Sequence, residues 1–157
     1  MANLSSCLEI CKASLFDAKV HFKNTRETAN AIRGMGLGQA KKFLKKICLF
    51  ENTVSFKRYK YGISRKSQNN KKHQNGRWPV KSAQFLMKLL KNIESNVSKK
   101  NLDTKCFYIK KVQVNKSVRG NRRTFRAHGC INSFSSHPCH IEIWVSRRSD
   151  VIQKNFF

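Results

Sequence analysis

The stretch "HGCINSFSSHPCH" holds the side chains best suited to chemistry, because it contains three of the five histidines and two of the six cysteines. Thiolate and imidazole groups are the ligands that structural zinc sites use. A hairpin turning at residues 132 to 136 would gather four such groups on one face, with Cys130 opposite His137 and His128 opposite Cys139. The spacing matches no usual structural zinc motif, however, and an earlier turn would spread these side chains along a single strand.

The same histidines fit a second chemistry, which is acid and base catalysis of RNA cleavage by His128 with His137 or His140. A metal-dependent nuclease would need converging carboxylates, but the eight Asp and Glu of this chain are scattered. Arginines beside the cluster have a simpler interpretation, because guanidinium groups clamp phosphates and stack on bases. Zinc binding, histidine catalysis and RNA contact by an extended arm are therefore the three alternatives for this stretch.

The charge balance points to a polyanionic partner. The 157 residues contain 33 Lys and Arg, and the formal net charge is +25. Such a charge repels itself in a compact free protein unless a polyanion neutralises it. Residues 52 to 93 and 104 to 141 contain no acid, whereas a merely solvated surface usually mixes both signs. These acid-free windows indicate a nucleic-acid-binding surface on a single domain.

Two strands flank the histidine and cysteine cluster. "CFYIKKVQVNK" alternates in polarity with a change of phase at its two central lysines, which predicts a bulge, a twist or a strand that leaves the core. "HIEIWVS" alternates without interruption. Because no helical pattern separates them, we expect an antiparallel hairpin with Phe107 near Arg147 and Lys116 near Pro138. Such a hairpin is centred near residue 127, and arms of about ten residues at roughly 3.3 Å each project about 30 Å.

The beginning of the chain predicts a short strand followed by a short helix. Val20 and Phe22 alternate with polar neighbours, which is typical of a strand. Asn24 or Thr25 can cap a helix that ends at Gly34. No secretory signal is expected, because charged residues interrupt the first twenty positions.

Two further helices carry apolar stripes. One begins after Gly36 or Gly38 and runs to Cys48 with a lysine-rich outer face, and its glycine-rich start, "GMGLG", is a helix-to-helix turn or a site for an RNA phosphate. The other has Pro79 in its first turn, ends near residues 99 to 101, and is expected to pack on the sheet as the core helix.

The segment "FKRYKYGISRKSQNNKKHQNGRWP" combines eight Lys or Arg with four aromatic residues and no acid. It has almost no apolar periodicity, so it cannot build its own core and is expected to be a loop. Basic groups interleaved with aromatic rings suit a segment that holds an RNA backbone and stacks on bases. A disordered, solvated loop is the alternative.

The cysteines contain no CxxC pair. Cys48 and Cys106 lie in apolar runs, so we expect buried thiols there and a reducing compartment for the protein. The sequence contains no run of eighteen apolar residues, so no membrane-spanning helix is expected.

Several long motifs resemble a universal family of ribosomal proteins. They are, in chain order, "VHFKNTRETANAI", "GRWPVKSAQFLMKLLKNIESN", "VQVNK" and "RRTFRAHGCINSFSSHPCHIEI". The family is the large-subunit ribosomal protein called L twenty-two in bacteria and L seventeen in eukaryotes, and the resemblance runs from about residue 18 to residue 147. The basic loop before Trp78 resembles the eukaryotic and archaeal branch.

The resemblance implies an α+β fold with three helices packed on a small three-stranded antiparallel sheet and a long protruding β-hairpin. It implies a structural constituent of the large subunit, without enzymatic activity, cofactor or metal, that binds and stabilises ribosomal RNA in translation. In the family the hairpin tip lines the exit tunnel of the nascent chain. By motif match the tip here is "RRTFRAHG", which favours a turn near residue 127 over the zinc geometry.

The resemblance also implies the domain boundaries. Residues 1 to 17 are expected to be an N-terminal extension, residues 18 to 148 a single RNA-binding domain, and residues 149 to 157 a short C-terminal tail. The domain includes a basic loop at residues 51 to 78 and an extended hairpin at about residues 106 to 147.

The expected site residues follow from the basic windows and the motif match. The residues expected to bind RNA are Lys23, Arg26, Lys41, Lys42, Lys57, Arg58, Lys60, Arg65, Lys66, Lys71, Lys72, Arg77, Trp78, Lys116, Arg119, Arg122, Arg123, Arg126 and His128. The residues expected to line the tunnel are Arg122, Arg123, Thr124, Phe125, Arg126, Ala127, His128 and Gly129.

The expected partners are large-subunit ribosomal RNA, neighbouring ribosomal proteins and the nascent polypeptide, with no membrane contact and no homo-oligomer. We expect the protein in cytoplasmic ribosomes, with assembly in the nucleolus if the source is eukaryotic. A free-standing nucleic-acid regulator or nuclease, with or without zinc, is the alternative from another functional class.

Overall fold

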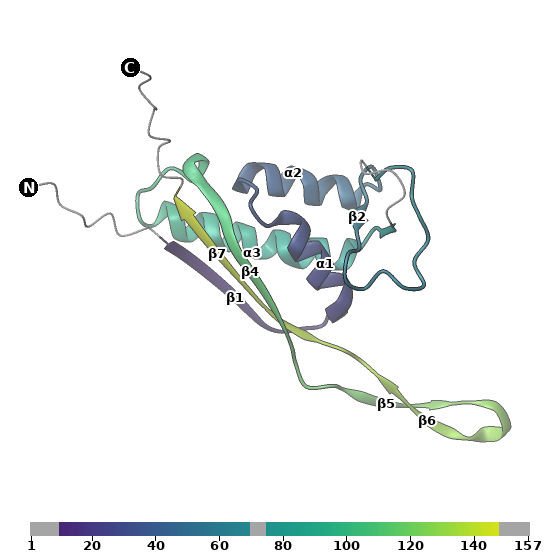
Figure 1. Cartoon of the computed structure of the whole chain (residues 1–157). Helices are drawn as coiled ribbons and strands as arrows, with labels where there is room; N and C mark the ends of the chain where they lie inside the picture. Colours follow the sequence, from purple (N-terminus) through teal and green to yellow (C-terminus); the bar gives the residue numbers. More distant parts are fainter. Residues whose placement is uncertain (1–9, 70–74, 148–157) are drawn as a thin grey trace, which may run out of the picture.

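A three-stranded antiparallel sheet and three helices form the body of the protein, from which a long hairpin protrudes (Figure 1). The computed structural model describes residues 10 to 69 and 75 to 147. The strand order in the sheet is β1, β7, β4, with β1 at Ile10–Ala18, β7 at Cys139–Arg147 and β4 at Phe107–Lys116. The helices are α1 at Phe22–Ile32, α2 at Leu37–Cys48 and α3 at Val80–Ser98. This architecture confirms the α+β fold.

Two short strand pairs and two single turns of 3-10 helix complete the described elements. One pair joins β2 at Val54–Ser55 to β3 at Gly76–Arg77, and the other joins β5 at Asn121–Phe125 to β6 at Ile131–Ser135. The 3-10 turns are Thr104–Cys106 and Ala127–Gly129.

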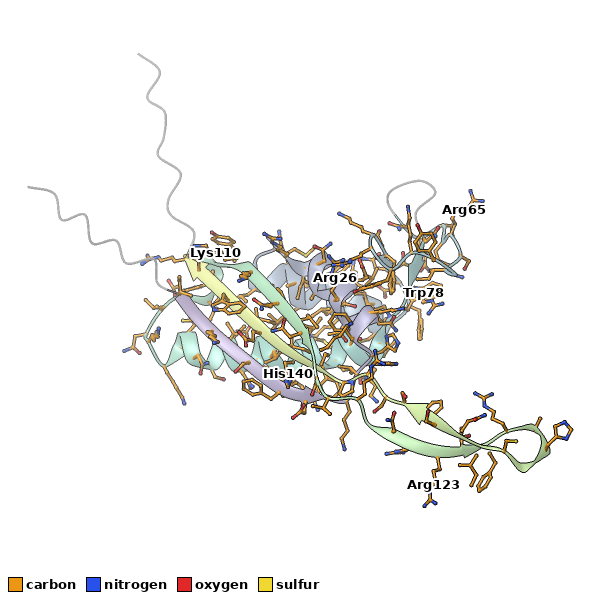
Figure 2. The ribbon with its side chains drawn as sticks, turned by 60° about the horizontal axis from the view of Figure 1, so that its bottom comes forward. Arg26, Arg65, Trp78, Lys110, Arg123 and His140 are labelled. Carbon is orange, nitrogen blue, oxygen red and sulfur yellow. The ribbon has the colours of Figure 1, made fainter. Side chains whose placement is uncertain are left out.

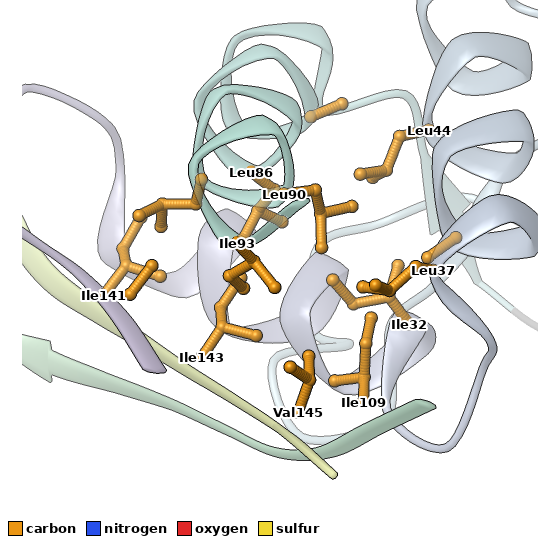
Figure 3. Close-up of a cluster of buried hydrophobic side chains, with 14 of the residues drawn as sticks. Ile32, Leu37, Leu44, Leu86, Leu90, Ile93, Ile109, Ile141, Ile143 and Val145 are labelled. Atoms are coloured by element: carbon orange, nitrogen blue, oxygen red, sulfur yellow. The ribbon is translucent and has the colours of Figure 1, made fainter. Parts of the chain in front are cut away.

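The core lies between α3 and the sheet. The predicted stripe of α3 is buried, and Leu86, Leu90 and Ile93 face Ile141 and Ile143 of β7 (Figure 3). Burying one such side chain contributes about 1.5–3 kcal/mol relative to leaving it in water. Pro79 was predicted in the first turn and instead occupies the N-cap position, one residue before the helix begins at Val80.

The hairpin register confirms the predicted pairing to within one residue. Phe107 pairs with Arg147, and Lys116 pairs with Cys139. The predicted bulge lies between Ile109 and Lys111, where the register shifts. At this point the backbone of Ile109 also exchanges hydrogen bonds with the turn between α1 and α2, so a second partner fixes the irregular strand.

The start of the chain corrects two predictions. Val20 and Phe22 do not form a strand, because Phe22 already opens α1, and the sheet strand is β1, which pairs with β7. Residues 10 to 17 were expected in an N-terminal extension and instead belong to the edge strand of the sheet. Their inward-facing side chains include Cys11 and Ala13, which are too small to give a strong periodic signal.

The cap of α1 also differs from the prediction. His21 occupies the N-cap position, in place of Asn24 or Thr25. The Thr25 hydroxyl instead lies inside the fold, where it contacts the Ser82 hydroxyl at 3.0 Å and donates to the carbonyl of His21. Packing of α1 against α3 therefore decides where the helix begins.

The basic loop is anchored more firmly than its composition predicts. Val54 and Phe56 are buried in the core, and the β2–β3 pair closes the base of the loop. The Cβ of an alanine at position 76 would lie 3.0 Å from the carbonyl oxygen of Val54, so Gly76 permits this close approach.

The cysteines allow a direct check of the fold. Free thiols are present at all five cysteines in the described residues, and Cys106 is exposed, so the prediction that it is buried was wrong. Burial raises the pKa of the Cys139 thiol and outweighs a hydrogen bond with Thr25. We expect iodoacetamide to modify Cys106 and Cys130 of the native chain and to modify Cys11 and Cys139 only after unfolding. Peptide mass spectrometry measures the order, and equal rates at all sites would contradict this packing.

Candidate RNA-binding surface

Residues 117 to 137, here called the distal hairpin, project from the body as an almost completely exposed ribbon (Figure 1). Strands β5 and β6 pair from Asn121 with Ser135 to Phe125 with Ile131. The turn is closed by the amide of Arg126, which donates to the Cys130 carbonyl at 2.8 Å. The hairpin is therefore centred next to the predicted residue 127.

The turn itself uses two residues in the left-handed region. His128 has a φ of 57° and Gly129 a φ of 68°. Glycine adopts this conformation without a steric penalty, whereas histidine does so less readily. The conformation directs the chain back toward the body within three residues.

The zinc geometry is not formed by this hairpin. Because the turn lies at residues 127 to 129, Cys130 and His137 follow one another along a single arm. His140 is taken up elsewhere, since its Nδ1 accepts the amide of Asp17 at 3.2 Å. Within residues 10 to 69 and 75 to 147, no group of three His, Cys, Asp or Glu converges for a metal.

Basic and apolar side chains are both exposed on the distal hairpin. Arg119, Arg122, Arg123 and Arg126 are all exposed, and Arg123 points away from the ribbon (Figure 2). Phe125 and Phe134 are 76% and 63% exposed, a degree of apolar exposure that usually marks a binding surface.

A second basic group surrounds one tyrosine on the body and is called here the Tyr59 cluster. The charged ends of Lys23, Arg26 and Arg58 lie 5.6, 5.9 and 5.7 Å from the centroid of the Tyr59 ring. Phe22 meets the same ring edge-on at a centroid distance of 6.2 Å. Cation–π attraction holds the three cations near the ring, so their charges are concentrated at one place although they come from two segments.

The buried side chain of Glu27 holds this cluster in position. Its side chain is 0% exposed, and its carboxylate accepts the backbone amides of Lys57, Arg58 and Tyr59 at 3.0, 3.2 and 3.3 Å. The Arg26 guanidinium adds a contact of 2.8 Å. Burial by itself would raise the pKa of Glu27, but the Lys57 amide and Arg26 outweigh it, so the pKa lies below its ordinary value.

A third group lies at the other end of the basic loop, around Trp78. Phe50 meets the indole at a centroid distance of 6.0 Å, and Lys66 lies 5.2 Å from the ring centroid. The indole N–H donates to Gln68 at 3.0 Å. Phe50 and the preceding Leu49 are both exposed, and neither was predicted as a binding residue, because both follow the last turn of α2.

The remaining predicted residues are distributed unevenly. Lys41 contacts Glu94 of α3, so part of its charge is neutralised, whereas Lys42 is exposed on the outer side of α2. Lys57, Lys60, Arg65 and Arg77 are exposed on the loop. Lys71 and Lys72 lie outside the described residues. Figure 2 shows Arg65 and Trp78 at one end of the body, Arg26 nearer its middle, and Arg123 on the distal hairpin.

The outer face of the sheet was not predicted as a binding surface. Trp144 on β7 pairs with Lys12 of β1 and with Lys111 of β4, and the two ammonium groups lie 5.4 and 5.0 Å from its ring. Glu142 also lies on this face, 3.7 Å from Lys12. Mixed charge distinguishes this face from the acid-free hairpin and loop.

The sequence was also compared with known protein families. The family described as "Ribosomal protein L22p/L17e" matches residues 13–146, which include the three helices, the basic loop, the distal hairpin and all but the outer ends of the sheet. The chain belongs to this family. Most of the L22p/L17e match coincides with the segment that the resemblance had covered.

Individual relatives agree with this assignment. A protein called "Large ribosomal subunit protein uL22" from Zea mays is 46% identical over 145 residues, covering 91% of this chain and 85% of the relative. Proteins of the same name from Podocoryna carnea and Aedes albopictus are 47% and 48% identical, covering 94% and 92% of this chain and 81% and 78% of those proteins. These sources fit the eukaryotic branch of the L22p/L17e family.

Family membership confirms the predicted role. The protein is a structural constituent of the large ribosomal subunit that acts in translation, and it is not an enzyme. It assembles in ribosomes with ribosomal RNA and other ribosomal proteins. Across the part of the chain that the structure describes, no helix combines the length and the apolar character needed to cross a membrane.

Proposed function

We propose that this L22p/L17e protein binds large-subunit ribosomal RNA with three surfaces and lines the polypeptide exit tunnel with the tip of its hairpin. The surfaces are the Tyr59 cluster, the loop around Trp78, and the distal hairpin. The observation that carries the proposal is the distal hairpin, which exposes four arginines and several apolar side chains and contains no acid. An exposed ribbon of this kind gains its stability from a partner that surrounds it.

Charge supplies the mechanism. Lys and Arg displace counterions from RNA, and each phosphate contact adds to the affinity and to its salt dependence. The β4–β7 ladder of the body is followed by the separate β5–β6 ladder of the distal hairpin, so the basic groups of the body and of the distal hairpin lie far apart. The hairpin thereby ties together RNA segments that would otherwise repel each other. Aromatic rings at Tyr59, Trp78 and Phe125 add surfaces on which bases stack.

The tip residues supply the tunnel contact. Arg122, Arg123, Thr124, Phe125 and the turn at residues 126 to 129 lie at the far end of the hairpin. In this proposal they lie at the tunnel wall, where Arg122, Arg123 and Arg126 also contact RNA phosphates and the turn faces the nascent polypeptide. The protein acts as a monomer in cytoplasmic ribosomes and, in a eukaryotic cell, joins the large subunit in the nucleolus.

Sedimentation tests the assembly. A lysate containing the chain with a C-terminal tag is separated on sucrose gradients at low and high salt, and each fraction is probed for the tag. We expect comigration with large subunits and polysomes that withstands high salt, because many phosphate contacts act together. A signal confined to light fractions, matched by antibody detection of the untagged chain, would contradict the proposal.

A further inference from the structure

A small pocket lies where the hairpin leaves the body. It has a volume of about 230 Å³ and lies between the start of α1 and the point where β4 ends and β7 begins. Its walls are formed by residues 21 to 23, residues 116 and 117, Arg119, and residues 137 and 138. Three segments that are distant in the sequence therefore meet at this one place.

The pocket is lined by positive charge. Lys23, Lys116 and Arg119 are exposed at its rim, and none of the described residues that line it is acidic. Asp17 lies nearby, because its carboxylate accepts the hydroxyl of Ser117, but it is an exposed residue outside the lining. In the described part of the chain the ion pairs engage none of the three cations.

The start of α1 adds hydrogen-bond donors to the same pocket. His21 at the N-cap makes no side-chain hydrogen bond to the helix, and the first turn contains no acid. The amide of Phe22 donates to the carbonyl of His137 at 3.2 Å, whereas the first-turn amides that follow have no acceptor within the helix. This end of the helix also carries the positive end of its dipole.

Two imidazoles complete the lining. The rings of His21 and His137 meet edge-on at a centroid distance of 6.0 Å. Burial lowers the pKa of His21, and His137, Lys23 and Arg77 lower it further. A bound anion would reverse this local potential, so the imidazole would take up a proton as the anion binds.

Apolar groups give the pocket a wall. Phe22 lines it, with the ammonium of Lys116 at 5.6 Å from its ring centroid. The same phenylalanine contacts Tyr59, so the pocket continues into the Tyr59 cluster. An extended RNA backbone therefore finds basic groups without interruption from the loop to the root of the hairpin.

We propose that this pocket binds one phosphate group through Lys23, Lys116, Arg119 and the paired imidazoles, and that in the ribosome this phosphate belongs to the RNA backbone. The statement that the bound phosphate belongs to RNA rests on the RNA binding proposed above. The binding of a phosphate group by the pocket stands on the lining alone. The affinity for an anion of fixed charge, such as an RNA phosphodiester, rises as the pH falls, because binding is coupled to protonation of His21.

Nuclear magnetic resonance of the full-length chain with labelled histidine tests the pocket. Inorganic phosphate is titrated at constant ionic strength between about pH 5 and pH 8, where histidine changes its charge. We expect saturable shifts of the His21 and His137 ring signals and no saturable shift at His128 of the tip. Sulfate, which keeps its two negative charges over this range, is titrated in parallel and should bind more tightly at the lower pH, because phosphate itself gains a proton as the pH falls. Equal, unsaturated shifts at all three histidines would show nonspecific counterion binding and overturn the proposal.

Matched variants separate this site from the general charge of the chain. Lys116→Gln with Arg119→Gln is expected to weaken phosphate binding by about tenfold or more, because two charge-assisted contacts are lost. Lys88→Gln with Lys91→Gln, on exposed positions of α3, removes the same charge and is expected to leave binding unchanged. Equal loss in both double variants, with native amide spectra, would overturn the site.

Diethyl pyrocarbonate, which modifies accessible neutral imidazoles, then distinguishes the sources of the phosphate. We expect inorganic phosphate to protect His21 and His137 of the free chain, and salt-washed large subunits in phosphate-free buffer to show the same protection. Reactive rings in those subunits would overturn the RNA source and leave free phosphate as the ligand. A chain that fails to enter large subunits would overturn the proposed function, while the titration still decides the pocket.

Discussion

Replacing Glu27 with Gln is expected to lower the free energy of unfolding by about 2–4 kcal/mol, because a buried charge that accepts several hydrogen bonds is lost. The carboxylate binds three consecutive loop amides and the Arg26 guanidinium. The glutamine amide has the same shape but only one acceptor oxygen. Its NH2 group would face the loop N–H groups, which are donors as well. The Tyr59 cluster should therefore lose its fixed position.

Urea unfolding of the full-length chain measures this effect, and limited trypsin digestion measures release of the loop. We expect faster cleavage between Lys57 and Lys66 in the variant. Glu94→Gln is the matched control, because Glu94 is partly exposed and contacts a single lysine, and such pairs contribute about 1 kcal/mol or less. Equal destabilisation by the two substitutions would contradict the anchoring role of Glu27.

The pH dependence of the free energy of unfolding tests the role of Glu27 independently. The pKa of Glu27 in the folded protein lies below its ordinary value of 4.5. A carboxyl of this kind contributes stability that is fully present above the ordinary value and is lost as the pH falls through the lower folded value. The difference in stability between wild type and Glu27→Gln should therefore shrink below about pH 4.5, and a constant difference would contradict the assignment.

Replacing Arg122, Arg123 and Arg126 with Ala is expected to weaken binding to large-subunit RNA by at least about tenfold and to flatten its salt dependence. The three guanidinium groups are exposed on the distal hairpin, and folding of the body does not depend on them. Filter binding across a salt series gives the affinity and the slope. The same variants should reduce incorporation into large subunits in sucrose gradients or alter nascent-chain stalling.

Two controls accompany the tip variant. Changing the three arginines to Lys keeps the charge and should restore the salt slope while recovering only part of the affinity, because lysine lacks the planar fork that binds phosphate through two hydrogen bonds. Changing Lys88, Lys91 and Lys99 to Ala removes equal charge from the body. Normal affinity, assembly and stalling in the tip variant would remove the distal hairpin from the proposed mechanism.

Regular periodicity explains which elements were predictable. The stripe of α3 repeats at the spacing of a helix over many residues, and Pro79 marks its start. The two hairpin strands alternate, and the change of phase in β4 correctly located the bulge between Ile109 and Lys111. A polar, acid-free stretch between the strands then required an exposed turn near its centre. These features are local, so neighbouring residues are sufficient to reveal them.

The elements that were missed depend on partners distant in the sequence. Strand β1 is defined by its pairing with β7, and its inward side chains are too small to give a clear alternation of apolar and polar residues. The start of α1 at Phe22 depends on packing against α3 and on the amide contact with His137. Cys106 follows an apolar pattern but lies at an exposed 3-10 turn before β4.

For the binding surface, the sequence by itself determined the sign of the charge, the residues of the hairpin tip and the resemblance to the L22p/L17e family. Only the tertiary structure decided which basic groups act together. It buried Glu27 beneath the loop, gathered three cations around Tyr59, and brought Lys23 beside Lys116 and Arg119. The reason is physical: charge and periodicity are properties of a segment, whereas a pocket exists only where the folded chain brings separate segments into contact.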